Sequence, residues 1–134
     1  GTEKWKVITF NFGLHDLKIM QDGKHQVGLA QYEKNLDAIA TRLEKTGARL
    51  LYVTTTPVPE GKLNPLRQPG DEVLFNKAAL AVMARHKIPV VDLYGFAKPR
   101  LAQIQTPANV HFTKDGSAML ADVVAKAIEE QLKK

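Results

Sequence analysis

Asn11, Gly13, His15 and Asp16 stand directly after the first apolar run of the chain, where they could take part in chemistry. The run before them, Val7–Phe10, lacks polar alternation, as in a strand covered on both faces of a parallel sheet. In such sheets the ligand crevice lies beyond the carboxyl ends of the strands. Polar and titratable side chains placed there can form hydrogen bonds to a ligand or exchange protons with it. We therefore expect a site at the end of this strand.

A second candidate, His111, lies immediately before the last helical pattern of the chain. Thr113, two residues later, is of a type that caps helix N-termini. An imidazole can act as the general base for a hydroxyl nucleophile, because a hydroxyl attacks poorly until its proton is taken. The alternative for His111 is a histidine that merely precedes a helix cap. Likewise, His15 and Asp16 can simply satisfy loop amides.

Hydroxyl nucleophiles are scarce in this sequence. Ser117 is the only serine, and solvation of the helix end explains its place in the first turn of the last helix. Thr54, Thr55 and Thr56 carry the necessary hydroxyl, but nothing beside them resembles an activated threonine. The chain therefore contains no convincing nucleophile of its own.

Composition narrows the remaining function classes. The chain has no cysteine, which excludes disulfides, thiolate nucleophiles and Cys-ligated zinc. A net charge of +5 would favour nucleic-acid binding only if Lys and Arg were clustered, and here they are spread over presumed helix exteriors. Glycine-rich nucleotide motifs and apolar runs of membrane-spanning length are absent. We expect a soluble protein without cofactor, metal, nucleic-acid or membrane partner. Its compartment is left open, secretion or a periplasmic location included.

A metal site is the alternative to a hydroxyl-based mechanism. His15, Asp16 and His111 are ligand types that zinc accepts. Their positions lack the close paired spacing of known zinc motifs. The sequence therefore favours a site without metal.

The elements that must position these residues follow from hydrophobic periodicity. Apolar runs predict parallel strands from Trp5 to Phe10, over residues 48–55 and over residues 88–93. Helical spacing follows each strand, and we expect Asp71 to cap the second helix. Alternating strands and helices imply a parallel sheet with helices on both faces. The predicted fold class is α/β, a flavodoxin-like three-layer α/β/α sandwich formed by residues 1–134 as a single domain.

The predicted first strand is apolar along its whole length. If it were an exposed sheet edge, it could pair with other chains and aggregate. We therefore expect another segment to pair with it.

Two stretches resemble blocks of the SGNH or GDSL-type serine hydrolases, which include esterases, acylhydrolases and carbohydrate deacetylases. Residues 11–16, Asn-Phe-Gly-Leu-His-Asp, resemble the third block, usually Gly-x-Asn-Asp, with Gly13 and Asp16 in register. Residues 111–116, His-Phe-Thr-Lys-Asp-Gly, resemble the last block, an Asp-x-x-His followed by a helix that begins Thr-x-x-Gly. Residues 54–59 also resemble the loop after the family's fourth strand.

The resemblance implies a role for each matched residue. His111 would be the catalytic general base. The loop Gly13 to Asp16, with His15 in place of the usual Asn and with Asn11 beside it, would stabilise the oxyanion and bind substrate. The position three before His111, usually an Asp that orients the imidazole, is Ala108. Asn109 or a backbone carbonyl would have to replace that Asp, unless the site works as a dyad.

The family's nucleophile lies in a Gly-Asp-Ser block after its first strand, and this chain has no such block. The resemblance therefore implies that the chain corresponds to the last two thirds of such an enzyme, with the N-terminal strands missing. The expected partners are a small-molecule or carbohydrate ester, and the missing segment or a second copy that pairs along the strand from Trp5 to Phe10.

The predicted function is serine-type hydrolysis of acyl or carbohydrate acetyl esters, with the serine supplied by a segment absent from this chain. We expect the chain alone to be inactive. The alternative is a non-catalytic binding or interaction module on the same fold, because fold does not fix function.

Overall fold

The computed structural model describes residues 4–134, in which helices and three short strands alternate. The strands are β1 (Val7–Phe10), β2 (Arg49–Val53) and β3 (Val90–Val91). The helices are α1 (Leu29–Glu44), α2 (Asp71–His86), α3 (Leu93–Ala97), the 3-10 turn η1 (Lys98–Arg100), α4 (Leu101–Ile104) and α5 (Lys114–Lys133).

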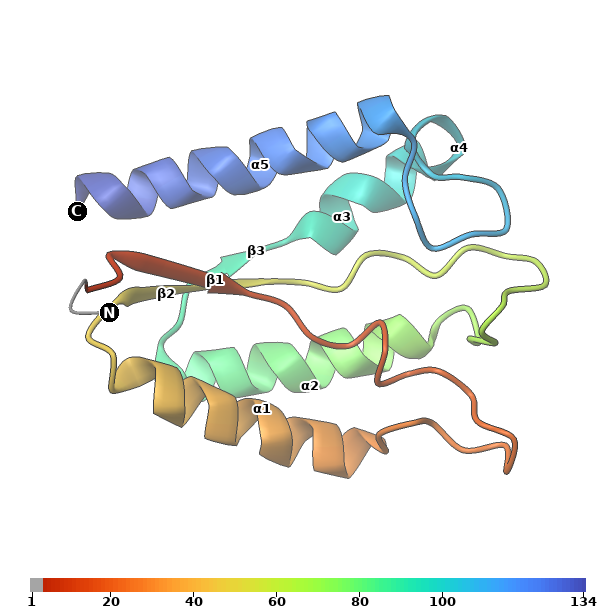
Figure 1. The fold of residues 1–134 in the computed structure, drawn as a ribbon, viewed down its shortest axis with the longest axis horizontal. Coiled ribbons are helices and arrows are strands. Elements are labelled where there is room, and N and C mark those ends of the chain that lie inside the picture. Colours follow the sequence, from red (N-terminus) through yellow and green to blue (C-terminus); the bar gives the residue numbers. More distant parts are fainter. Residues whose placement is uncertain (1–3) are drawn as a thin grey trace.

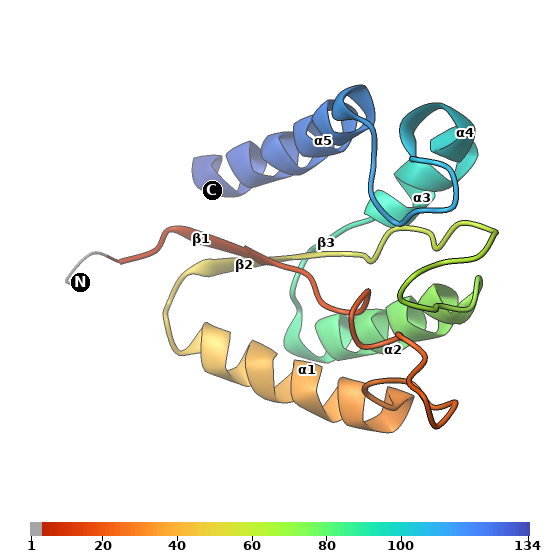
Figure 2. The same ribbon diagram turned by 45° about the vertical axis from the view of Figure 1, so that its right-hand side comes forward.

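The sheet is parallel, with strand order β1-β2-β3. Helices α1 and α2 cover one face, and α5 lies across the other with α3 and α4 beside it (Figures 1 and 2). The predicted three-layer α/β/α sandwich is therefore confirmed. In Figure 1 the carboxyl ends of the strands point to the right, where the loops after β1 and β2 and the loop before α5 gather.

Burial follows the helical period on the α1 and α2 side of the sheet. In α1 the fully buried side chains Tyr32, Leu36 and Ala40 recur every four residues and therefore face the sheet as one stripe. Phe75 of α2 packs against Tyr32 with ring centroids 4.9 Å apart. Burying a side chain of this size contributes about 2 kcal/mol of hydrophobic free energy. This layer therefore fixes Tyr32, which extends to the end of β1.

Thr113 caps helix α5 as predicted, and its Oγ1 accepts a hydrogen bond from the Gly116 nitrogen at 3.0 Å. A side chain at Gly116 would collide with the Ile104 carbonyl oxygen, so glycine allows α5 to start close against α4. The cap and this close approach together fix the chain immediately after His111. Neither α5 nor any other helix of residues 4–134 is long and apolar enough to cross a bilayer.

Four predictions about the ends of elements were wrong. Strand β1 starts at Val7, and Trp5 lies before it with 72% of its surface exposed. Asp71 does not cap α2, because its carboxylate is 2.7 Å from His25 Nε2 while Glu72 accepts from the Gly70 nitrogen at 2.8 Å. Both other strands are shorter than predicted, β2 by three residues of the run 48–55 and β3 by four residues of the run 88–93.

Candidate functional site

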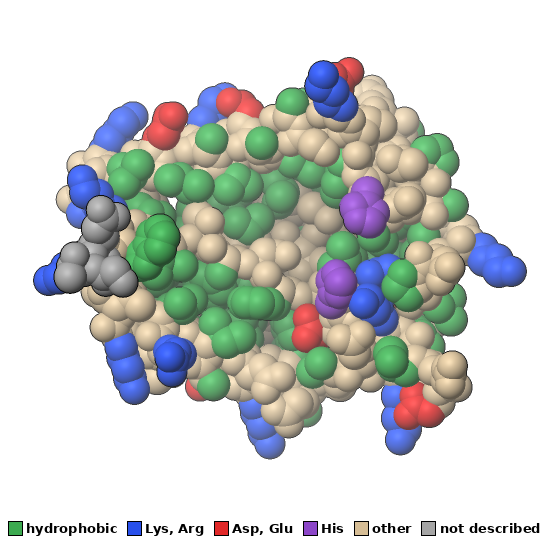
Figure 3. All heavy atoms as spheres, viewed as in Figure 1, with side chains coloured by type: hydrophobic (Ala, Val, Ile, Leu, Met, Phe, Trp, Pro, Cys, Tyr) green, Lys and Arg blue, Asp and Glu red, His purple; other side chains and the backbone are tan. Residues whose placement is uncertain are grey.

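The loops at the carboxyl ends of the strands enclose a cavity that contains both candidate histidines. His15, from the loop after β1, and His111, from the loop before α5, line the same cavity of about 270 Å³. Asn109, Lys18 and Arg67 also line it. Figure 3 shows two histidine side chains at one end of a hollowed face of the molecule. The topology thus brings together residues that lie almost a hundred positions apart in sequence.

His111 is held by its neighbour Asn109. The Asn109 Oδ1 atom lies 2.9 Å from the His111 backbone nitrogen and 2.7 Å from the ring Nδ1. The backbone N–H can only donate, so the Asn109 atom facing it must be the carbonyl oxygen, which can only accept. Nδ1 therefore carries a proton, and Nε2 of the neutral ring keeps its lone pair. This is the tautomer that a general base requires when a hydroxyl approaches Nε2.

The backbone before Asn109 adopts an uncommon conformation. Ala108 has φ of 47°, in the left-handed region that few residues other than glycine occupy. A side chain at Gly61 would come within 3.1 Å of the Ala108 Cβ, so the loop after β2 packs tightly here. This packing holds the turn that presents Asn109 and His111.

The loop after β1 is anchored by a buried group of hydroxyls, which we call the hydroxyl cluster: Tyr32, Tyr52 and Thr55. All three donate toward the carbonyl oxygen of Phe12, at 2.9, 3.2 and 3.0 Å respectively. The two tyrosine oxygens are 3.1 Å apart. Burial is the main cause that raises the pKa of Tyr52 and of Tyr32, so both remain protonated donors at neutral pH.

The hydroxyl cluster determines the direction of the Gly13 amide. Because the peptide is trans and planar, its N–H points opposite to the Phe12 carbonyl, away from the hydroxyl cluster. Gly13 has φ of 142°, and a side chain there would collide with Thr55 Oγ1. Glycine is therefore required at this position on both steric and conformational grounds. Its N–H makes no backbone hydrogen bond within residues 4–134 and is available as a donor.

Asn11 and Asp16 stand apart from this cavity. Asn11 lines a neighbouring pocket, and its Nδ2 donates to the Val53 carbonyl at 2.7 Å, so it joins the ends of β1 and β2. Asp16 is half-buried, and its carbonyl accepts from the Val27 nitrogen at 3.0 Å. Both contacts are structural, and substrate-binding roles for these two residues stay predictions.

Arg67 is a site residue that sequence reasoning missed. It is 5% exposed, and it donates from Nε to the Leu14 carbonyl at 2.8 Å and from Nη1 to the Pro65 carbonyl at 3.2 Å. Arg67 lies in a proline-rich loop with no periodic pattern, so nothing in the sequence distinguishes it from a solvated arginine. Only the folded loop places its charge beside His15 and His111.

Among the described residues, no hydroxyl makes a hydrogen bond to the His111 side chain. Ser117 is exposed on the first turn of α5, and no hydrogen bond links it to His111. Thr55 donates to Phe12, and Thr54 contacts Asp92 Oδ1 at 3.3 Å. His15, Asp16 and His111 do not form a group that could hold a metal ion; across residues 4–134 no such group of three or more ligands occurs.

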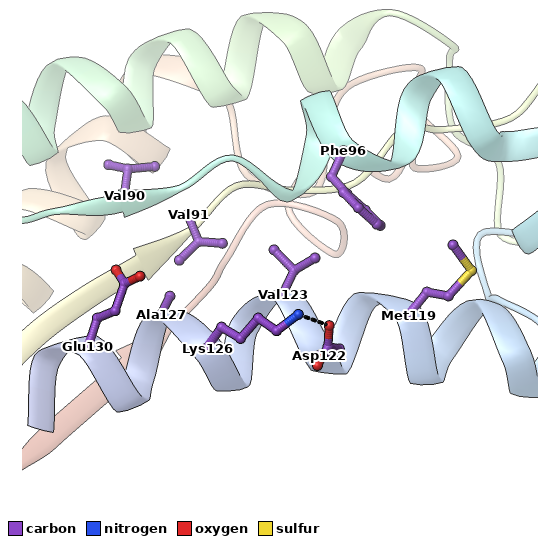
Figure 4. Close-up of a pocket in the computed structure, with 9 residues that line it drawn as sticks. All are labelled: Val90, Val91, Phe96, Met119, Asp122, Val123, Lys126, Ala127 and Glu130. Carbon is purple, nitrogen blue, oxygen red and sulfur yellow. Dashed lines mark hydrogen bonds and ion pairs between the residues drawn. The ribbon is translucent and has the colours of Figure 1, made fainter.

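A larger groove of about 530 Å³ lies elsewhere, between the outer edge of β3 and α5 (Figure 4). Val91, Phe96 and Val123 give it apolar walls, while Lys126 and Asp122 pair at its rim at 2.7 Å. None of the candidate site residues lines it. We therefore place the site at the smaller cavity.

Comparisons with known proteins agree with the α/β/α fold described above. The family model described as the GDSL-like lipase/acylhydrolase family matches residues 1–119. No curated protein sequence matches the chain.

Several solved structures share the fold. The lipase/acylhydrolase from Enterococcus faecalis superposes with a TM-score of 0.78 at 21% identity, over 94% of this chain and 62% of that one. A GDSL-like lipase from Bacteroides thetaiotaomicron gives 0.73 at 19% identity, over 93% and 62% respectively. An acetyl xylan esterase gives 0.75 at 17% identity, over 92% and 67%. The chain thus spans about three fifths of the length of the first of these structures.

Proposed function

The chain belongs to the GDSL-like lipase/acylhydrolase family, and on that premise we propose that it carries the general base and oxyanion-stabilising groups of a serine-type ester hydrolase. The substrate class is an acyl or carbohydrate acetyl ester, in keeping with the acetyl xylan esterase among the similar structures. One observation carries the proposal: the Asn109 oxygen fixes the base-competent tautomer of His111 in a cavity that His15 shares.

In the proposed mechanism, His111 Nε2 takes the proton of a serine hydroxyl as that oxygen attacks the ester carbonyl. A tetrahedral intermediate forms, and its oxyanion accepts hydrogen bonds from the Gly13 N–H and the His15 ring. The imidazolium then returns the proton to the leaving alcohol, which leaves an acyl-enzyme. Water activated by the same imidazole releases the acid. Asn109 is a positioning residue throughout, because its side chain holds His111 and takes no part in the proton transfers.

The serine in this proposal comes from a segment that pairs with the free side of β1. Within the described residues β1 has β2 as its only strand neighbour, and its side chains Val7, Ile8 and Thr9 are not fully buried. A strand placed alongside would end next to the loop at Gly13, so a residue following it would enter the site.

Assay of residues 1–134 against para-nitrophenyl acetate tests this assignment. We expect hydrolysis at the background rate, because removal of the nucleophile from a catalytic triad costs about a millionfold in turnover. A longer form of the protein that supplies the serine-bearing strand should hydrolyse the ester and be blocked by a serine-directed inhibitor. Inhibitor-sensitive turnover by residues 1–134 alone would contradict a nucleophile supplied from outside.

A non-catalytic binding module on the same fold remains the second candidate. The exposed position of Ser117, the only serine in the sequence, away from His111 favours it. The two candidates differ in the longer form: a hydrolase turns over the ester, whereas a binding module retains the ligand without releasing acid.

Replacing Asn109 tests whether its side chain orients the His111 imidazole or has only a structural role in the loop. In the longer form, Asn109→Ala should lower kcat/KM about 100-fold, because the imidazole is no longer held in one orientation. Asn109→Asp should retain activity and move the acidic limb of the pH–rate profile to higher pH, because a carboxylate stabilises the imidazolium more than an amide does. A purely structural Asn109 would leave the pH profile of the Asp variant unchanged. Steady-state kinetics across pH give both readouts.

A further inference from the structure

Arg67 and Lys18 give the cavity of His15 and His111 an unbalanced positive charge. Arg67 is almost fully buried, and its two hydrogen-bond partners, the carbonyls of Leu14 and Pro65, are uncharged. Within the part of the chain that the structure describes, no Asp or Glu lines the cavity. None of the ion pairs in the described residues involves Arg67 or Lys18.

The guanidinium retains donors for a further partner. Of its five N–H groups, one on Nε and one on Nη1 are used, which leaves three. Nη2 has no hydrogen bond, and it is not among the buried polar atoms that lack both a partner and solvent contact in residues 4–134. It is therefore accessible, and Arg67 lines this cavity. The two N–H groups of Nη2 and the remaining one of Nη1 lie on one planar group and can donate to the two oxygens of a carboxylate.

A buried charge without a counter-ion is costly to the folded protein. Burial lowers the pKa of Arg67 from its ordinary value, which is the expected sign for a cation taken out of water without a charged partner. Arginine nevertheless stays protonated at neutral pH. A bound anion would supply the missing counter-charge, so the site is electrostatically prepared for one.

We propose that this cavity is a subsite for a carboxylate on the ester substrate, held by Arg67 with Lys18 at its side. The inference rests on the proposed hydrolase function and narrows it to esters that carry a carboxylate near the scissile bond. That carboxylate belongs either to the acyl group, as in a half-ester of a dicarboxylic acid, or to the alcohol, as in an acylated uronic acid. The shared feature is the carboxylate.

Binding of two carboxylate probes to residues 1–134 tests the subsite without requiring turnover. Succinate represents the acyl source and glucuronate the alcohol source, and succinamide and glucose are their uncharged counterparts. Titration calorimetry with NMR of the arginine side chains should show that at least one acid binds about tenfold more tightly than its uncharged counterpart and shifts the Arg67 signal. Which acid binds identifies the source, and binding of both means that the cavity recognises the carboxylate alone.

Variants identify the residues that bind the probe. Arg67→Gln should weaken binding of the carboxylate about tenfold, and Lys18→Gln about threefold. Lys24→Gln is the matched control, because Lys24 is exposed in the same loop and does not line the cavity. If Arg67→Gln fails to fold, the effect of Lys18→Gln on carboxylate binding tests the subsite.

Equal binding of acids and uncharged counterparts, or binding unaffected by Lys18→Gln, would overturn the subsite. Failure of the longer form to hydrolyse any ester, with carboxylate binding intact, would instead remove the hydrolase function and leave the subsite standing.

Discussion

His111→Ala in the longer, serine-containing form is expected to reduce ester hydrolysis by about a millionfold while leaving the fold intact. The ring is exposed and, among the described residues, hydrogen-bonds only to Asn109 of the same loop, so its removal leaves no cavity in the core. The large effect follows because the serine hydroxyl loses the group that takes its proton. Measurement of kcat/KM with para-nitrophenyl acetate gives the loss of activity, and circular dichroism of the variant shows whether the fold is retained.

His86→Ala is the control for loss of a histidine as such. His86 lies on α2 and contacts Glu44 and Asp37 on α1, remote from the cavity. Its replacement should leave kcat/KM within about twofold and reduce only stability, by about 0.5 kcal/mol. Activity retained in His111→Ala, or lost equally in His86→Ala, would remove His111 from the mechanism.

Gly13→Ala is expected to destabilise the protein by about 3 kcal/mol, the largest stability effect that we predict for a single methyl group. The φ of 142° is unfavourable for alanine, and the new Cβ would collide with Thr55 Oγ1 inside the hydroxyl cluster. Relief of the collision requires the loop to move and the Phe12 carbonyl to lose its hydroxyl donors. Urea unfolding followed by circular dichroism measures the change in free energy.

Gly23→Ala is the control variant, because it measures the cost of backbone strain without a steric collision. Gly23 has φ of 76°, but a side chain there meets nothing within 4 Å. Its replacement should cost about 1 kcal/mol, the strain of a left-handed alanine alone. If Gly13→Ala costs no more than Gly23→Ala, the contact with the hydroxyl cluster contributes nothing to stability.

The sequence predicted the sandwich because uninterrupted apolar runs and four-residue spacing are local signals of buried strands and helices. The limits of β3 were harder to predict, since they depend on the residues that flank the strand. Pro89 lacks an N–H for the ladder, and Asp92 Oδ1 accepts from the Gly95 nitrogen at 2.9 Å and so starts α3. Strand β2 ends where Thr55 pairs its backbone with the Asn76 side chain, at 2.8 Å in both directions.

The candidate site could also be predicted only in part. His15 and His111 could be assigned to one end of the sheet, because both follow or precede recognisable elements. The resemblance left Asn109, a backbone carbonyl or no partner at all for the His111 ring, and the structure places the Asn109 oxygen 2.7 Å from Nδ1. Arg67 and the hydroxyl cluster had no local signal, because each acts through residues twenty or more positions away or through carbonyls that only the folded loop presents.

The parallel register of β1 gives its four residues two different environments. The Lys6 carbonyl accepts from the Arg49 nitrogen at 3.0 Å, so Ile8 and Phe10, in phase with Lys6, direct their backbone groups toward β2. Val7 and Thr9 direct theirs away from it. A two-residue alternation of fast and slow amide deuteration along β1 is the signature of an open edge, and uniform protection is the signature of an occupied one. Deuterium uptake at a single short strand thus reports whether a neighbour is docked, whatever that neighbour is.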